Sequence, residues 1–343
     1  GWGNVSGFGK DTNSQTLRGG GWAEKKTVTL QIKPLKKGLV YRSTGSRYAV
    51  ESEGDFYTCR IKGKMRLQGI QSTNPVAVGD HVFFEVVEDA EKREGNITKI
   101  EERKNYIVRK SVNLSKQTHI IASNIDQVFL MVTLNNPPTF PAFIDRFLVT
   151  AEAYHIPAIL LFNKIDSYTE SELEDLRNLK RVYDGIGYQT LEISAKTGLH
   201  IKTVRTLMKN KIAMISGHSG VGKSSLINSV DPDLNLKTSS ISEQHQQGTH
   251  TTTFAEMFAL QDGIKIIDTP GIKGFGVVDM APEEIGTYFP EFLKRKTACK
   301  FNNCLHQNEP QCAVLAGVQE GTISQSRHES YLQLLAGDNP YRM

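Results

Sequence analysis

Residues 211–229 read Lys-Ile-Ala-Met-Ile-Ser-Gly-His-Ser-Gly-Val-Gly-Lys-Ser-Ser-Leu-Ile-Asn-Ser. An apolar run at 212–215 predicts a strand, and the glycine-rich turn after it fits the phosphate-binding pattern G-x-x-x-x-G-K-[ST] from Gly217 to Ser224. We expect a helix to begin at Lys223. The alternative is a chance glycine-rich turn, which the strand–turn–helix context disfavours.

The residue types in this turn suit phosphate binding. Gly217, Gly220 and Gly222 let successive backbone N–H groups converge on one anion, beside the positive end of a helix dipole. Lys223 supplies a charge for the outer phosphates, and the Ser224 hydroxyl can ligate Mg²⁺. The remaining predicted contacts of the turn are His218, Ser219, Val221 and Ser225.

The composition is that of an ordinary globular protein of two or three domains. The chain has 343 residues, 38% of them hydrophobic and 23% charged, and a net charge of +4 that permits a nucleic-acid partner without requiring one. No apolar run reaches membrane-spanning length, and the polar, glycine-rich beginning does not resemble a signal peptide. We therefore expect a cytoplasmic protein without membrane contact, and a monomer.

The first part of the chain predicts a flexible or added arm followed by a small barrel. Residues 1–35 show no sustained periodicity. Residues 36–108 contain five short alternating runs, which predict an all-β barrel of the OB-fold type. These runs are 38–42, 46–51, 56–61, 81–87 and 95–100.

A basic loop at 60–66 lies beside Phe56 and Tyr57, and this combination suits stacking on RNA bases. The alternative is a solvated charged hairpin. Cys59, between these aromatic residues and the loop, is expected to be a small core residue.

Residues 109–285 predict an α/β domain. A charged connector at 101–110 precedes alternating strands and helices, the rhythm of a doubly wound parallel sheet. The first strand, at 126–134, is apolar on both faces, as parallel strands are. The other predicted strands are 156–162, 188–193, 212–215 and 264–267, and the predicted helices before the phosphate turn are 143–154, 171–183 and 201–208.

Asn163-Lys-Ile-Asp166 follows one of these strands, at the sheet edge where open α/β sheets bind ligands. The Asp166 carboxylate can accept two hydrogen bonds from guanine, whereas adenine would leave it unsatisfied. Lys164 can lay its aliphatic stem over the base, and Asn163 can tie this loop to the phosphate turn. Taken alone, the four-residue motif fits a solvated turn equally well.

Ser194-Ala-Lys196 follows the next strand, where the Ala195 N–H is expected to donate to the guanine O6. Asp268-Thr-Pro-Gly271 follows the strand at 264–267. Asp268 is placed to hold the Mg²⁺ shell, and the Gly271 N–H to sense the γ-phosphate.

Residues 248–253 read Gly-Thr-His-Thr-Thr-Thr and lie between the phosphate turn and Asp268. A threonine here is expected to ligate Mg²⁺ when the triphosphate is bound; we favour Thr252 over Thr251. The polar residues 239–247 before it have no core pattern, which indicates a switch segment.

The order of these motifs along the chain is unusual. Translational GTPases begin with the phosphate turn and end with the base-reading motifs, whereas here Asn163 and Ser194 precede Gly217. The sequence therefore predicts a circularly permuted GTPase domain, in which Asp268 leads directly into the C-terminal region.

The C-terminal residues 286–343 contain Cys299-x₄-Cys304-x-His306-x₅-Cys312. Three thiolates and one imidazole form a closed tetrahedral set for one structural Zn²⁺. The alternative is a disulfide plus a spare thiol. In this mostly helical module we expect a second RNA-facing surface, formed by Phe289, Phe292 and 294–296, and a closing helix at 325–335.

From residue 36 to 343, the barrel, the permuted motif order and the Cys/His module resemble the RsgA/YjeQ family of bacterial GTPases. The resemblance implies an OB-fold, a permuted GTPase domain and a zinc domain. It also implies binding of GTP and GDP, and a role in late maturation of the small ribosomal subunit, contact with its rRNA, and hydrolysis stimulated by that subunit.

The resemblance also bears on hydrolysis. Ile272 stands where Ras-like proteins carry a water-positioning glutamine, so intrinsic hydrolysis should be slow. The family's substitute is a histidine that matches His250. The alternatives are that His250 is an ordinary switch residue or that His245 takes the role. Thr249 stands where relatives often carry a basic residue, which puts an RNA contact there in doubt.

Three functions remain to be distinguished. The first is a GTPase that binds the small subunit and leaves it after hydrolysis. The second is a GTP-dependent RNA-binding factor with incidental hydrolysis, acting on another RNA. The third, an ATPase, is disfavoured by Asp166.

Overall fold

The protein is described here from a computed structural model, which covers residues 35–61, 75–87, 92–110, 118–234, 254–269 and 280–337. The N-terminal arm before residue 35 and the part of the basic loop after residue 61 lie outside this range. Among the described residues, no helix combines the length and the apolar character needed to cross a bilayer.

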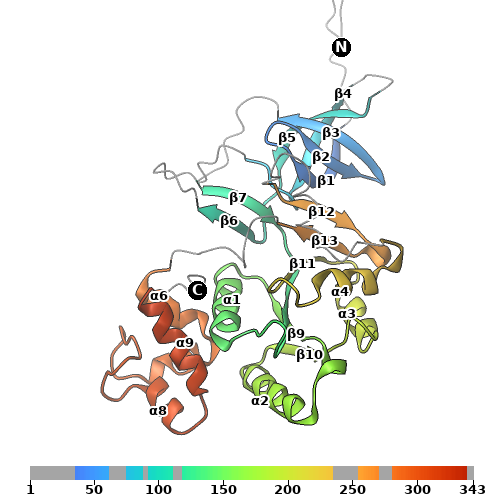
Figure 1. The fold of residues 1–343 in the computed structure, drawn as a ribbon. Coiled ribbons are helices and arrows are strands. Elements are labelled where there is room, and N and C mark those ends of the chain that lie inside the picture. Colours follow the sequence, from blue (N-terminus) through green and yellow to red (C-terminus); the bar gives the residue numbers. More distant parts are fainter. Residues whose placement is uncertain are drawn as a thin grey trace, which may run out of the picture. The chain divides into compact units, whose positions relative to one another are not determined.

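The first described part is a closed five-stranded barrel (Figure 1). Strand β1 pairs with both β2 and β4, and β3 pairs with β5 in parallel, which closes the order β1-β2-β3-β5-β4. The strands are β1 (Leu35–Ser43), β2 (Tyr48–Ser52), β3 (Asp55–Ile61), β4 (His81–Val87) and β5 (Glu94–Ile100). The OB-type barrel predicted from alternation is therefore confirmed.

The barrel interior is filled by alternate side chains of these strands, among them Val50, Phe84 and Ile97. Cys59 lies in this core with no exposed surface, and burial raises the pKa of its thiol to about 12. It is the small core residue that the sequence predicts.

The second part contributes six strands of order β10-β9-β8-β11-β13-β12, parallel except for β12, and β12 continues the sheet into the barrel by antiparallel pairing with β1. Its strands are β8 (Gln127–Val132), β9 (Ala158–Phe162), β10 (Gln189–Glu192), β11 (Ile212–Ser216), β12 (Glu256–Ala259) and β13 (Lys265–Asp268). The antiparallel edge strand β12 was not predicted, because its four residues are too few to show alternation.

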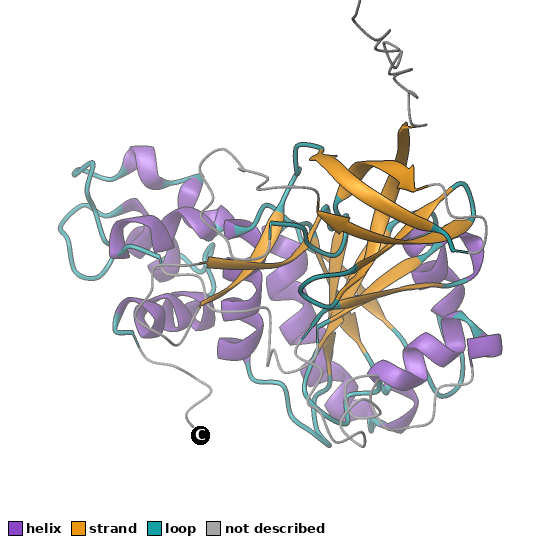
Figure 2. Cartoon of the chain, turned by 90° about the horizontal axis from the view of Figure 1, so that it is seen from above, coloured by secondary structure: helices purple, strands orange, loops and turns teal. Residues whose placement is uncertain are grey.

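Helices cover both faces of this sheet (Figure 2). On β8, Val128 and Leu130 face one hydrophobic core and Phe129 and Met131 face the other. The first core is completed by α1 (Pro141–Ala153) and α2 (Glu170–Ile186), and the second by α3 (Ile201–Met208) and α4 (Lys223–Val230). This is the doubly wound arrangement expected from the strand–helix rhythm.

One region differs from the expected connector. Strand β6 (Tyr106–Lys110) pairs with β7 (Thr118–Ser123) in a two-stranded sheet, so the second half of the segment at 101–110 is a strand rather than a linker. The expected boundary at 108/109 falls inside β6. Ile107 of this hairpin lies in the core of the parallel sheet, which the charged residues around it conceal in the sequence.

The C-terminal part is mostly helical, as expected. It contains α6 (Pro282–Ile285), α7 (Pro290–Leu293), α8 (Ala313–Gln319) and α9 (Gln325–Leu335), and α9 has the predicted bounds. Ile285 already belongs to its core, one residue before the expected boundary. Phe289 and Phe292 have no exposed surface, so the prediction that they face RNA is wrong: they form the core of this module.

Candidate functional site

The phosphate turn connects β11 to α4, and its glycines are needed for local reasons. Gly222 has φ +104°, and a Cβ there would lie 2.5 Å from Asn163 Nδ2. At Gly217, with φ +148°, a Cβ would lie 2.9 Å from the Met131 carbonyl oxygen. Larger residues would therefore push this turn away from the neighbouring strand ends.

The Lys223 ammonium bends back over the turn. Its Nζ donates to the carbonyl oxygens of Gly217 at 2.7 Å and His218 at 3.0 Å. Ser224 follows in the first turn of α4 and is buried, as are Leu226 and Ile227, which face the core as predicted. One charge and one hydroxyl thus flank the start of the helix.

His218 fixes the outer side of the turn. Its ring packs on Phe143 of α1, with centroids 4.1 Å apart. Burial, and then the charge of Lys223, lower the pKa of the imidazole. The neutral imidazole is therefore favoured, so His218 does not add a second cation beside Lys223.

Asn163 joins three motifs. It follows β9 and is buried, and its Nδ2 donates to the Val221 carbonyl at 2.8 Å. Its Oδ1 accepts from the Ala195 N–H at 3.0 Å. One amide therefore connects its own loop both to the phosphate turn, as expected, and to the Ser194–Lys196 loop.

The Asp166 carboxylate is held by the neighbouring loop. The Ser194 hydroxyl donates to Asp166 Oδ1 at 2.6 Å and accepts from the Thr197 N–H at 3.1 Å. Lys164, with φ +69°, begins the short turn that carries Asp166. This orientation leaves Asp166 Oδ2 without a bond to the described residues.

Ala195 differs from its expected role. Its N–H, assigned to guanine O6 from the sequence, already donates to Asn163. A base carbonyl would have to share this donor. The Ala195 carbonyl is also occupied, because it accepts from the Ser229 hydroxyl at 2.7 Å. The competition for the Ala195 N–H depends on the folded arrangement of the two loops, which the sequence does not show.

These contacts form a continuous path between the two ends of the site. It runs from Asp166 through Ser194 and Ala195 to Asn163, and from there to Val221, two residues before Lys223. The base-reading and phosphate motifs therefore lie close together at the carboxyl ends of β9 and β11, the two parallel strands that flank β8. This is where an open α/β sheet binds its ligand.

A loop after β8 also belongs to this edge and was missed in the sequence. The Tyr168 hydroxyl accepts from the Leu134 N–H at 2.9 Å and donates to the Asn163 carbonyl at 3.1 Å. Glu172 accepts from Asn135 Nδ2 at 2.8 Å. The turn-forming residues at 135–138 directly after a parallel strand were the signal that could have indicated this loop.

Asp268 is the last residue of β13, at the same edge of the sheet. Several other predicted residues lie outside the described part of the chain. These are Thr251, Thr252, His245, His250, Gly271 and Ile272, together with the rest of the switch segment after residue 234.

A Cys₃His cluster is the second candidate site. The ligand atoms of Cys299, Cys304, His306 and Cys312 all lie within 4.8 Å of one another. His306 Nδ1 is 3.7 Å from Cys299 Sγ and 3.3 Å from Cys312 Sγ, and the two sulfurs are 4.0 Å apart. All four cysteines of the chain are free, so the structure contains no disulfide here.

These separations match a tetrahedral ion. With metal–sulfur bonds of about 2.3 Å and metal–nitrogen bonds of about 2.0–2.1 Å, the edges would be about 3.8 Å and about 3.6 Å. The cluster is also supported from α9: His328 donates to the His306 carbonyl at 2.8 Å, and Tyr331 to the Leu305 carbonyl at 2.6 Å. The residues present therefore fit a structural Zn²⁺.

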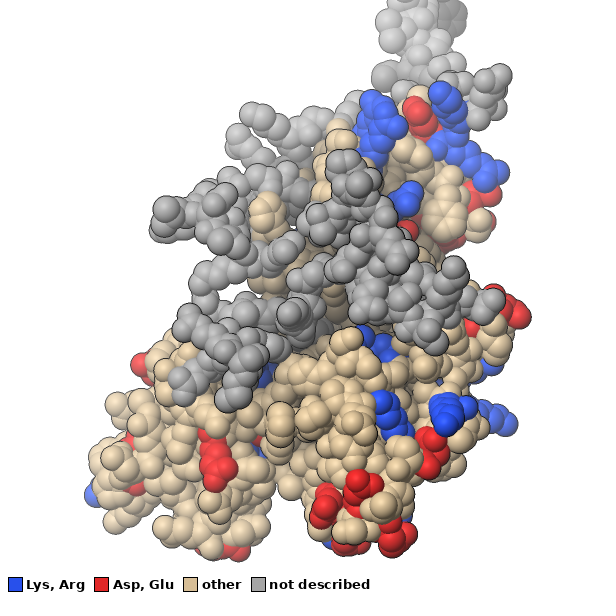
Figure 3. Space-filling view, viewed as in Figure 1, with Lys and Arg blue, Asp and Glu red and all other residues tan. Residues whose placement is uncertain are grey.

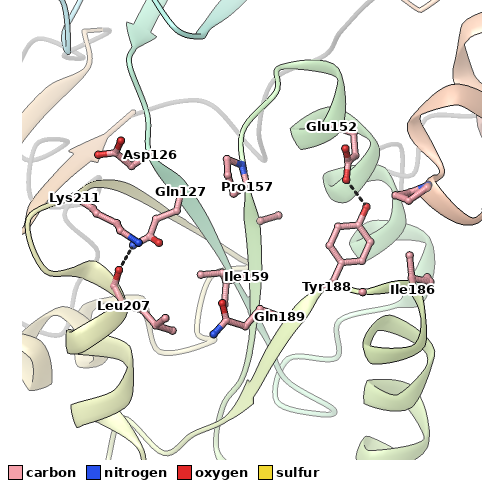
Figure 4. A pocket seen from close by; sticks show the side chains of 13 residues that line it. Asp126, Gln127, Glu152, Pro157, Ile159, Ile186, Tyr188, Gln189, Leu207 and Lys211 are labelled. Carbon is pink, nitrogen blue, oxygen red and sulfur yellow. Dashed lines mark hydrogen bonds between the residues drawn. The ribbon is translucent and has the colours of Figure 1, made fainter. Parts of the chain in front are cut away.

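A pocket of about 590 Å³ lies at the opposite edge of the parallel sheet (Figure 4). Its lining includes Gln127, Ala158 and Gln189, the first residues of three parallel strands, and a hydrogen bond from Tyr188 to Glu152 at 3.0 Å. No part of the phosphate turn lines it. It is therefore separate from the edge that carries the nucleotide motifs.

Comparison with known proteins agrees with this geometry. The model of the RsgA GTPase family matches residues 100–278, and that of the RsgA N-terminal domain matches 37–97. The chain is 63% identical to the small ribosomal subunit biogenesis GTPase RsgA of Christiangramia forsetii, over 88% of this chain and 96% of that one. It is 53% identical to the protein of the same name from Bacteroides fragilis, over 87% and 96%.

Two solved structures are similar as well. The crystal structure of YjeQ from Thermotoga maritima has a TM-score of 0.72 and 34% identity, and covers 89% of this chain and 99% of that one. The structure of YloQ, described as a circularly permuted GTPase, has a TM-score of 0.68 and 27% identity, and covers 90% and 97%.

The sheet order, and motifs that run from Asn163 and Ser194 to Gly217 and Asp268, define a circularly permuted GTPase. Within this class, the family models and the high identity over most of the chain decide the family. The chain belongs to the RsgA family.

Proposed function

We propose that this protein hydrolyses GTP as a late assembly or checkpoint factor of the small ribosomal subunit, and leaves the subunit after hydrolysis. The names of the relatives support the pathway. The observation that carries the nucleotide site is the Asn163 side chain, which hydrogen-bonds the base-reading loop to both neighbouring motifs.

In the proposed complex, guanine is read by Asp166, with Lys164 over the base and the loop 194–196 at its O6. The phosphates lie in the turn 217–225, with the Lys223 ammonium at the outer phosphates. Lys223 would exchange its bonds to two loop carbonyls for phosphate oxygens, which its flexible stem allows. Gly271 is proposed to sense the γ-phosphate.

The reaction is attack of water on the γ-phosphate of GTP, giving GDP and inorganic phosphate. Lys223 and the backbone N–H groups of the turn stabilise the charge that develops on the phosphate oxygens. Mg²⁺, held by Ser224, Thr252 and Asp268, would supply further neutralisation when bound. His250 is proposed to orient the water.

We assign Zn²⁺ to Cys299, Cys304, His306 and Cys312. The set leaves no open coordination position, so the role of the ion is structural. We propose three domains: a barrel (36–108), a GTPase domain (109–285) and a zinc module (286–343). The ion would stabilise the fold of the zinc module.

The barrel and the zinc module are the proposed rRNA-binding parts. Figure 3 shows Lys and Arg side chains over the barrel, with acidic side chains among them, and acidic side chains over α2. Exposed arginines of the barrel strands and turns include Arg42, Arg47, Arg60 and Arg93. Such a distribution favours a polyanion at the barrel end. We further propose a cytoplasmic monomer.

The decisive test is the GTPase rate of the full-length protein with and without purified small subunits. We expect strong stimulation at saturating subunit. Hydrolysis that does not respond to subunits would reject the checkpoint role and favour a GTP-dependent factor for another RNA. The variant Asp166→Asn should shift preference from guanosine to xanthosine nucleotides, and unchanged selectivity would remove Asp166 from base reading.

A further inference from the structure

The loop between the first two cysteines of the Cys₃His cluster is exposed along its whole length. Lys300, Phe301, Asn302 and Asn303 are all exposed, and 40% of Phe301 is accessible. The other aromatic residues next to the cluster are buried: Phe289, Phe292 and Tyr331 have at most 1% exposure. Phe301 is therefore not part of the module's core.

The loop is fixed at both ends. Cys299 and Cys304 belong to the cluster itself. The Lys300 N–H donates to the Gln311 carbonyl at 3.2 Å, and the Cys304 N–H closes a tight turn on the Phe301 carbonyl at 3.2 Å. Because this backbone is already ordered, a ligand would bind it at little cost in conformational entropy.

The four exposed side chains have complementary chemistries. The Lys300 ammonium lies over one face of the Phe301 ring, 5.6 Å from its centroid. A base would stack on the other face, with the ammonium close enough to meet a neighbouring phosphate. The amides of Asn302 and Asn303 each provide donors and an acceptor, as needed for base edges. Stacking, a cation and amide groups together are typical of single-stranded RNA recognition.

The charge around the loop favours RNA over a protein partner. Residues 292–304 contain Lys294, Arg295, Lys296 and Lys300 and no acidic residue, so this segment alone carries +4, equal to the net charge of the whole chain. Two acidic residues lie nearby. Glu309 accepts from the N–H groups of Leu305 and Gln307, at 2.7 and 2.8 Å. Glu320 lies 3.9 Å from Arg295, which leaves Lys294, Lys296 and Lys300 as the cations of this segment without an acidic partner among the described residues. A polyanion is the partner that this surface fits.

A single exposed phenylalanine needs no functional explanation. Here four consecutive exposed residues lie on a loop clamped by the cluster, within a segment that contains four cationic residues and no acidic one. We propose that the loop Lys300–Asn303 binds single-stranded RNA, with one base stacked on Phe301. This inference rests on the proposed function, and it specifies which surface of the zinc module meets rRNA in place of Phe289 and Phe292.

The test uses the full-length protein and its variant Phe301→Leu, which keeps an apolar side chain but removes the aromatic face. The matched control is Leu293→Ala, which alters another residue of the module that is 50% exposed but lies outside the loop. Zinc content and circular dichroism establish that both variants are folded. Affinity is measured for a fluorescein-labelled single-stranded RNA of mixed sequence by anisotropy, and for small subunits by co-sedimentation.

We expect Phe301→Leu to weaken RNA binding at least about fivefold, as loss of one stacked base does. Leu293→Ala should match the unaltered protein, and Phe301→Trp should retain affinity. Equal affinity of Phe301→Leu and the unaltered protein for both ligands overturns the inference while leaving the proposed function intact.

Two further outcomes also overturn it. If Phe301→Leu loses small-subunit binding but keeps RNA binding, the loop contacts a protein. If the unaltered protein binds neither subunits nor RNA, the proposed function is rejected, and this inference is rejected with it.

Discussion

Two buried aspartate–arginine pairs lie where the barrel and the zinc module meet the GTPase domain, and the two junctions differ in composition. At the barrel, the pair lies within residues 36–108 and is linked to the GTPase domain by Ser123. At the barrel junction, Asp80 accepts from Arg103 at both carboxylate oxygens, each at 2.6 Å, and from the Ser123 hydroxyl at 2.6 Å. The Ala77 N–H adds a fourth bond at 2.8 Å. One carboxylate thus meets one guanidinium, and the charges balance.

At the zinc-module junction, two carboxylates share one guanidinium. Arg327 of α9 donates to Asp145 of α1 at 2.9 Å and to Glu291 of α7 at 2.6 and 3.1 Å. Burial alone would lower the pKa of Arg327, but the two carboxylates outweigh it and raise that pKa. Burial raises the pKa of Asp145, and Arg327 opposes this effect. The junction therefore depends on a single cation.

The two junctions also differ in distance along the chain. Asp80 and Arg103 are 23 residues apart, whereas Asp145 and Arg327 are 182 apart. The pair at the barrel junction therefore joins nearby parts of the chain, whereas the pair at the zinc module joins α9 to a helix far earlier in the sequence. The comparison indicates that the stability of this module depends on Arg327 and, if the proposed Zn²⁺ is bound, on the Cys₃His cluster as well.

The largest effect is expected from metal removal. Structural Zn²⁺ contributes about 10–16 kcal/mol in small zinc-dependent folds, so chelation should unfold the module. Hydrogen exchange should then show loss of protection in α9, with the barrel strands β1–β5 unchanged. Cys304→Ser should reproduce this result. Protection of α9 that survives chelation would contradict the dependence on metal.

The next effect concerns Arg327→Met. Removing the cation leaves the buried Asp145 and the half-buried Glu291 without a cationic partner, at a cost of about 3–5 kcal/mol. The free energy of unfolding from urea titration measures it, with Arg181→Met, an exposed arginine of α2, as the control. A loss no larger than that of the control would mean that the junction does not hold the module.

A smaller loss is expected for Asp80→Asn at the barrel junction. Asparagine keeps one acceptor for Arg103 but turns an amide donor towards the others, which should cost about 2–3 kcal/mol. The same urea titration measures it, with an Asp55→Asn control at the exposed Asp55–Arg93 pair. If Asp80→Asn costs more than Arg327→Met, the proposed ranking of the two junctions is reversed.

Local patterns carried most of what was predicted. The phosphate turn, the Asn163–Asp166 motif and the cysteine spacing each lie within a few consecutive residues, and the barrel strands alternate clearly. What could not be predicted depends on partners far along the chain. Nothing near Asp145 in the sequence indicates Arg327, and the short strand β12 is defined only by its pairing with β13.

The sequence also did not show which side chains of short helices are buried. Phe289 and Phe292 lie near a basic run, and helix α7 has only four residues, too few to show which side faces the core. The sequence therefore suggested a surface where the structure has a core. Similarly, the Ala195 N–H had a plausible ligand in the sequence, but its actual partner, Asn163, is 32 residues away.

The finest test of the comparison is a matched pair of serine-to-alanine variants. Ser330 donates to Asp145 Oδ2 at 2.5 Å, and within the described part of the chain this oxygen has no other donor. Ser123 donates to Asp80 Oδ1, which also accepts from Arg103. Ser330→Ala should therefore leave a buried oxygen unsatisfied and cost about 2–3 kcal/mol, against about 1 kcal/mol for Ser123→Ala.

Urea titrations of the two variants side by side measure this difference, and since both remove one hydroxyl of the same size, the cavity contributions should cancel. Equal losses would indicate that water or a rearranged Tyr183 hydroxyl, 3.0 Å from Asp145 Oδ1, replaces the missing donor. In that case the zinc-module junction would tolerate the loss of a hydroxyl donor, and its stability would depend mainly on the Arg327 guanidinium.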